Sequence, residues 1–118
     1  MKASEYLKEG FNCAESIIKA FNEEHNTDIP VKIGSGMGGG FSSGSLCGAV
    51  GASAMIIGYL KGRENNDEEN NARKYVKEFM DEVKEDYGTE ICRELKRDKV
   101  SCGDIVDYSY MKLNEKVK

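Results

Sequence analysis

The chain has 118 residues, of which 39% are hydrophobic and 32% are charged, and its net charge is −4 at pH 7. This length and composition predict a single globular domain, residues 1–118, that buries a core without disulfide cross-links. The acidic balance argues against nucleic-acid binding, which requires a concentrated basic surface. The first nine residues lack the apolar core of a signal peptide, and the longest apolar run is too short to span a bilayer. We therefore expect a cytoplasmic protein with no membrane partner.

Helical periodicity dominates the first part of the chain. Apolar residues recur at steps of three and four from Leu7 to Phe21, which predicts an amphipathic helix over about residues 3–25. Polar residues and Pro30 end this helix, and the short stretch Val31–Ile33 is predicted to be extended. The most glycine-rich stretch of the chain, Gly34–Gly44, is predicted to be a loop with left-handed or tightly turned backbone.

A second helix is predicted from a cap near Ser45 to about Leu60. Its residues are apolar or small on every side, which is typical of a helix at the centre of a domain. Small residues from Cys47 to Gly58 recur at helical spacing on one face, so a neighbouring helix can approach closely. This Gly/Ala-rich helix is therefore expected to be buried.

Three more helices are predicted in the second half of the chain. A strongly amphipathic helix runs from Ala72 to Tyr87 and is stopped by Gly88, and a short one, capped by Thr89, runs to about residue 96. The sequence Ser101-Cys102-Gly103-Asp104 resembles a capping box and opens a last helix to about residue 115. The predicted fold class is all-α, a compact bundle of four to five helices.

Four cysteines, Cys13, Cys47, Cys92 and Cys102, are the candidate functional residues. In a reducing compartment, such thiols are more often catalytic, redox-active or metal-binding than structural. The last three fall in the first turn of a predicted helix, where free N–H groups and the helix dipole stabilise a thiolate. We therefore expect lowered pKa values for these three. Cys13 is predicted to lie in mid-helix, where a small buried hydrophobic residue is an equally good interpretation.

The cysteines and their neighbours resemble a known family. The matching segments are Asn12-Cys13-Ala14-Glu15, Gly36-Met37-Gly38-Gly39-Gly40-Phe41, Cys47-Gly48-Ala49, Gly88-Thr89-Glu90-Ile91-Cys92-Arg93-Glu94-Leu95, and finally Cys102. In this order they resemble the redox-active protein family named for its Cys…Cys-Gly-Ala-x-x-Gly…Cys…Cys pattern, the C_GCAxxG_C_C family. One departure is visible, because the last glycine of the motif falls on Ala52, with Gly51 one place earlier.

The resemblance implies a redox site at the four cysteines, and two mechanisms fit it. In one, Cys47 is a low-pKa thiolate that forms a reversible disulfide with Cys13, Cys92 or Cys102. In the other, all four thiolates hold an iron–sulfur cluster that transfers single electrons, since a related module also looks like part of certain cytochromes with an iron–sulfur centre. The chain would then be an oxidoreductase or an electron carrier with a redox partner protein.

Two alternatives stay open beside this interpretation. Four thiolates also suit tetrahedral zinc, which would make the chain a structural zinc-binding or interaction domain without redox activity. The glycine-rich loop formally fits G-x-G-x-x-G, but a nucleotide site needs a strand before it and a helix at its end, so no nucleotide is expected. The glycines of this loop are instead expected to shape the backbone around Cys47, and their N–H groups to donate to sulfur or to a bound anion, with Gly48 and Ser45 as supporting residues of the site. The sequence leaves the oligomeric state open.

Overall fold

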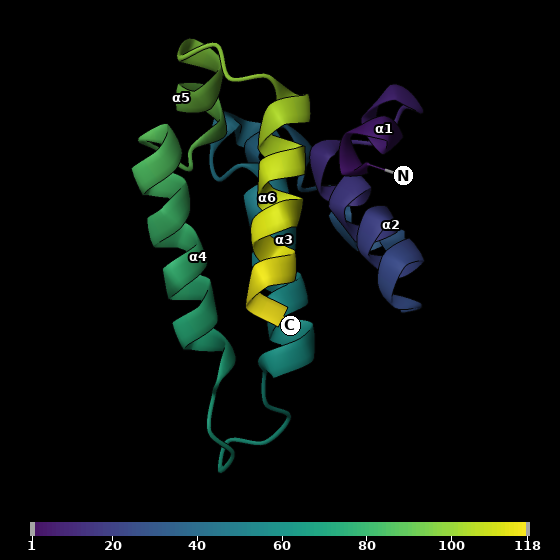
Figure 1. Ribbon diagram of the computed structural model, residues 1–118, viewed down its shortest axis with the longest axis vertical. Helices are drawn as coiled ribbons and strands as arrows, with labels where there is room; N and C mark the ends of the chain where they lie inside the picture. Colours follow the sequence, from purple (N-terminus) through teal and green to yellow (C-terminus); the bar gives the residue numbers. More distant parts are fainter. Residues whose placement is uncertain (1, 118) are drawn as a thin grey trace.

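Helices make up the regular structure of the chain. The computed structural model describes residues 2–117, in which one isolated antiparallel bridge, Leu46 with Ile91, accompanies the helices. The expected all-α class is confirmed (Figure 1). The elements are α1 (Ala3–Lys8), α2 (Cys13–His25), the 3₁₀ turn η1 (Val31–Gly34), the irregular turn η2 (Gly40–Gly44), α3 (Gly48–Lys61), α4 (Ala72–Tyr87), α5 (Cys92–Arg97) and α6 (Cys102–Val117). No helix of residues 2–117 combines the length and the apolar character needed to cross a membrane.

The central helix is α3, as its composition predicted. Figure 1 shows it behind α6, with α4 on one side and α2 on the other, and it packs against all three. Its residues from Gly48 to Ser53 are buried, as are Ile56 and Ile57. Burying an isoleucine side chain contributes roughly 1.5–3 kcal/mol. Because α3 carries no charge before Lys61, surrounding it with helices leaves no ionised group without water.

The predicted helix over residues 3–25 is two helices, α1 and α2, so the bundle has one α-helix more than the upper number expected. The chain turns at Gly10, whose φ of +105° is a conformation that favours glycine. Asn12 then caps α2: its side chain accepts a hydrogen bond from Glu15 N–H, and the Glu15 carboxylate accepts one from Asn12 N–H. The apolar period continues across the break because both helices face the same core. Cys13 is consequently the first residue of α2, and its predicted mid-helix position is wrong.

The segment before α3 is compact and irregular. Val31–Gly34 forms a 3₁₀ turn, so the predicted extended conformation is wrong there. The expected left-handed backbone is confirmed, since four consecutive residues, 39–42, have φ between +58° and +68°. Two of them are not glycine: the Phe41 ring lies against Gly51 of α3, and Ser42 Oγ donates to the carbonyl of Gly36 (3.1 Å). These contacts offset the strain of left-handed backbone, on the order of 1–3 kcal/mol per residue.

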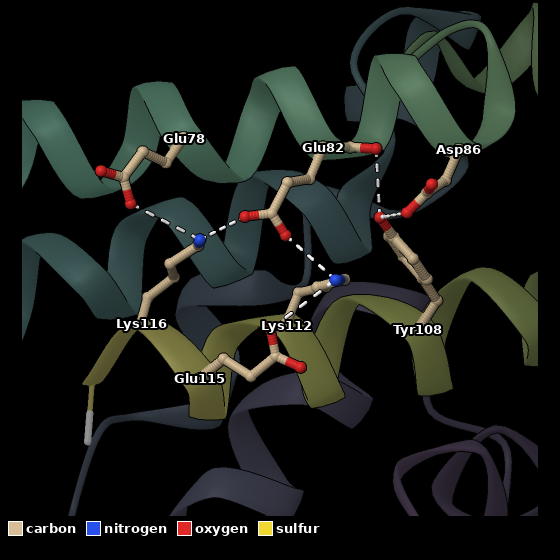
Figure 2. Close-up of polar contacts among 7 residues, drawn as sticks. All are labelled: Glu78, Glu82, Asp86, Tyr108, Lys112, Glu115 and Lys116. Atoms are coloured by element: carbon tan, nitrogen blue, oxygen red, sulfur yellow. Dashed lines mark hydrogen bonds and ion pairs between the residues drawn. The ribbon is translucent and has the colours of Figure 1, made fainter.

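A polar seam joins α4 to α6 (Figure 2). Glu82 of α4 pairs with both Lys112 (3.1 Å) and Lys116, and Lys116 also reaches Glu78 (3.5 Å). The hydrogen bond from Lys116 lowers the pKa of Glu82, despite partial burial. Tyr108 of α6 donates to the carbonyl of Glu82 (3.1 Å). The seam adds polar contacts between α4 and α6 to the packing of α6 against α3.

Candidate redox site

All four cysteines line one pocket of about 190 Å³. Each lies at the start of a helix: Cys13, Cys92 and Cys102 are the first residues of α2, α5 and α6, and Cys47 directly precedes α3. Figure 1 shows α3 and α6 both beginning at the end of the bundle where α5 lies. Residues 89 positions apart in the chain therefore border the same space. The other lining residues are Leu7, Asn12, Gly39, Leu95, Lys96, Val100 and Ile105.

Two short backbone segments hold Cys47 beside Cys92. Cys47 N–H donates to the carbonyl of Glu90 (2.9 Å), and Cys92 N–H donates to the carbonyl of Ser45 (2.7 Å). These two hydrogen bonds flank the antiparallel bridge between residues 46 and 91. Ser45, expected as a supporting residue of the site, positions Cys92 by accepting this hydrogen bond through its backbone carbonyl.

The four thiols differ strongly in their access to solvent. Cys47 is 4% exposed and Cys92 is 9% exposed, whereas Cys13 is half-buried and Cys102 is exposed. All four are free thiols in this structure. The pocket therefore runs from a surface cysteine to buried ones, with mostly apolar side chains between them.

Cys13 and Cys47 form a hydrogen-bonded pair. The Cys47 thiol donates to the Cys13 sulfur, and this bond, with further donors in the backbone N–H groups of Gly39, Ala49 and Ala14, lowers the pKa of Cys13 to about 6 although burial opposes the shift. The same hydrogen bond and burial raise the pKa of Cys47. The expected lowered pKa of Cys47 is therefore wrong. Since only one of two adjacent buried sulfurs can be an anion, the half-buried Cys13 takes the charge.

A family model matches the part of the chain that carries the four cysteines. The model described as "Putative redox-active protein (C_GCAxxG_C_C)" matches residues 11–116, a range that includes all four cysteines. The chain belongs to this family. No curated protein and no solved structure matches the chain.

Close packing around the sulfurs explains why two positions of this C_GCAxxG_C_C family member are glycine. A Cβ on Gly48 would lie 2.6 Å from the Cys13 sulfur and 2.6 Å from the carbonyl oxygen of Met37. A Cβ on Gly40, where φ is +68°, would lie 2.5 Å from the Cys92 Cβ. Gly48, which the sequence indicated only as a support, thus makes the room in which the Cys13 sulfur sits.

Sequence reasoning missed the roles of Asn12 and Gly40 in this site. Asn12 starts the helix that carries Cys13, and its side-chain amide also donates to the carbonyls of Gly34 (3.1 Å) and Ser35 (3.2 Å). Gly40 leaves space for Cys92, and beside it Gly39, one of the loop glycines expected to donate to sulfur, donates its N–H to the Cys13 sulfur. The spacing of Asn12 and Glu15 is a capping-box signal that identifies the helix start. The two glycine roles depend on contacts between distant segments.

The arrangement of the four thiols bears on metal binding. Within residues 2–117, no group of three or more His, Cys, Asp or Glu side chains is arranged so that it could hold a metal ion. The residue types still suit a soft metal or a cluster, because four thiols border one pocket. The residues that line the pocket include one basic side chain of α5, that of Lys96.

Proposed function

We propose that this protein is a small thiol–disulfide redox protein in which Cys13 and Cys47 alternate between a dithiol and a disulfide. Two features support the proposal: Cys13 and Cys47 border the same pocket, and the interaction with Cys47 lowers the pKa of Cys13 to about 6. At neutral pH this places a thiolate nucleophile beside a protonated second thiol. A thiolate is the attacking species in disulfide exchange, and a pKa near the ambient pH favours it.

The reaction proceeds in two exchange steps. The Cys13 thiolate attacks one sulfur of a substrate disulfide R–S–S–R, forming Cys13–S–S–R and releasing RS⁻. Cys47 then attacks the Cys13 sulfur, releases the second RS⁻ and gives its own proton to a leaving thiolate. Two electrons pass to the substrate, and the products are the Cys13–Cys47 disulfide, one RS⁻ and one RSH.

The reactivity of Cys47 changes between the two steps. While Cys13 is an anion, its hydrogen bond with Cys47 holds the Cys47 proton in place and raises the pKa of Cys47. Once Cys13 is part of a mixed disulfide, that anion is gone and this cause of the raised pKa disappears. Cys47 therefore becomes able to act as the resolving thiol when it is needed.

Mild oxidation with diamide, followed by alkylation and peptide mass spectrometry, tests the proposal. The expected result is a Cys13–Cys47 disulfide in the unaltered chain and in Cys102→Ser, and none in Cys13→Ser or Cys47→Ser. Unfolding in urea checks that each variant folds. A folded protein that never forms this disulfide would refute the dithiol mechanism.

A second candidate function is supported by the pocket that the four cysteines share. An iron–sulfur cluster there would be held by Cys13, Cys47, Cys92 and Cys102 and would supply one-electron transfer. Zinc on the same thiolates would supply structural stability instead. Anaerobic purification with a visible spectrum and iron, sulfide and zinc analysis separates these cases. Brown protein that bleaches when any one cysteine is replaced supports the cluster, stoichiometric zinc supports the structural role, and colourless metal-free protein supports the dithiol.

A further inference from the structure

We propose that Cys92 and Cys102 form a second dithiol, through which an acidic dithiol protein reduces the Cys13–Cys47 disulfide. This inference rests on the proposed function and deepens it, since it assigns the remaining two cysteines and states the chemistry of the redox partner. It is supported by solvent access, by the backbone contacts around the pocket and by the charge of α5.

Access separates the outer thiol from the inner ones. Cys102 is exposed at the first residue of α6, with Ser101 exposed before it and the small Gly103 after it. Cys47 and Cys92 are almost fully buried behind it. Of the four thiols, Cys102 is the exposed one, so the active-site cysteine of another protein has the freest access to it.

Cys92 is placed to connect the surface thiol with the inner pair. Its backbone is tied to the segment that carries Cys47 by the hydrogen bond to Ser45, while its side chain borders the pocket that Cys102 also borders. The chain between the two outer cysteines is the short helix α5 and a turn in which Lys99 has a φ of +64°. This short connection brings Cys92 and Cys102, the first residues of α5 and α6, to the same pocket.

Charge indicates the kind of partner. Lys96 borders the pocket with Cys102, and Arg93, Arg97 and Lys99 are exposed on the same short segment of chain, although the chain as a whole carries a net charge of −4. Arg97 is partly neutralised by Asp98 (3.2 Å). A basic patch on an acidic protein steers partners of negative surface potential and raises their association rate. The partner that fits is therefore a dithiol protein with an acidic surface around its reactive cysteine.

The electrons move by three exchanges that balance. First, the partner dithiol reduces the Cys92–Cys102 disulfide through a mixed disulfide on Cys102 and is itself oxidised to a disulfide. Next, Cys92, as thiolate, attacks the Cys47 sulfur, and Cys13 leaves, because the thiol of lower pKa leaves faster. Finally, Cys102, as thiolate, attacks the Cys92 sulfur and releases Cys47, which takes up the proton that Cys102 lost. Two electrons reach the inner pair, and the outer pair is left oxidised for the next partner.

Reduction of the fully oxidised protein by a reduced thioredoxin, an acidic dithiol protein, tests the relay. Loss of the Cys13–Cys47 disulfide is followed by acid quenching, alkylation and mass spectrometry in the unaltered chain, Cys102→Ser and Cys92→Ser. We expect each variant to lose the inner disulfide at least ten-fold more slowly than the unaltered chain. The small reductant tris(2-carboxyethyl)phosphine, which needs no docking surface, should reduce all three at similar rates. Raising the salt concentration should slow the reduction of the unaltered chain by thioredoxin.

The possible results distinguish failure of the relay from failure of the proposed function. Equal rates for the unaltered chain and Cys102→Ser with thioredoxin, including no reduction of either, overturn the relay while the inner disulfide and the proposed function stand. An oxidised protein without a Cys13–Cys47 disulfide overturns the proposed function and the relay with it. A thioredoxin variant that lacks its second cysteine should be trapped on Cys102, and trapping on Cys13 instead would also overturn the relay.

Discussion

Replacing Gly48 with alanine should damage the redox site in a way that can be measured. The new methyl group would lie 2.6 Å from the Cys13 sulfur and 2.6 Å from the Met37 carbonyl oxygen, far inside an ordinary contact distance. Overpacking of this kind costs about 1–3 kcal/mol, and alanine in a helix returns about 0.5–1 kcal/mol relative to glycine. We therefore expect Gly48→Ala to lower the free energy of unfolding by about 1–2 kcal/mol.

The same substitution should change the chemistry of Cys13. Its sulfur must move away from α3, which weakens the hydrogen bond from Cys47 that holds the pKa of Cys13 at about 6. The pKa of Cys13 should then rise toward the ordinary thiol value of about 8.5. The assay is the rate of iodoacetamide alkylation of Cys13 as a function of pH, read by peptide mass spectrometry, with urea unfolding for stability.

Gly58→Ala is the matched control. Gly58 lies in the same helix, but a Cβ built there meets no atom within 4 Å. This variant should therefore gain about 0.5–1 kcal/mol from helix propensity alone and should leave the pKa of Cys13 unchanged. If Gly48→Ala is as stable as Gly58→Ala, or keeps the pKa of Cys13 at about 6, then Gly48 does not make the space for the sulfur and our reading of the site is wrong.

Three further predictions follow from the contacts around the site and the α4–α6 seam. Asn12→Ala should lower the free energy of unfolding by about 1–2 kcal/mol in urea unfolding, because it removes the helix cap and two hydrogen bonds to the 3₁₀ turn; a loss below about 0.3 kcal/mol would contradict the capping role. The lowered pKa of Cys13 stabilises the folded chain fully above the unfolded thiol pKa, and this stabilisation is lost as the pH falls through about 6. The melting temperature of the unaltered chain should thus rise relative to that of Cys13→Ser between pH 6 and about pH 8.5, and parallel curves would argue against a thiolate. Lys116→Met should lower the free energy of unfolding by about 1 kcal/mol or more, because Lys116 is 12% exposed and joins α6 to α4. Lys77→Met, which removes an exposed ion pair, should change it by less than about 0.5 kcal/mol. Equal effects of the two substitutions would contradict a stabilising role of the α4–α6 seam.

Local signals explain which parts of the fold could be predicted. The boundaries of α4 follow from its apolar period and from Gly88, whose φ of +80° ends the helix. Ser101 caps α6 as predicted, accepting a hydrogen bond from Asp104 N–H (3.0 Å). The break between α1 and α2 at Gly10 was not predicted, because the apolar period continues across it. Periodicity reports which face is buried, whereas only the cap residues report where one helix stops and the next begins.

The sequence by itself determined the helical class, the buried central helix and the identity of the four thiols, because composition and period act over short stretches of chain. Only the tertiary structure decided that helix starts far apart in the chain meet at one pocket. It also decided which of two neighbouring thiols is the anion. That choice depends on a hydrogen bond between Cys13 and Cys47 and on their unequal burial, and both are set by how α2 packs against α3.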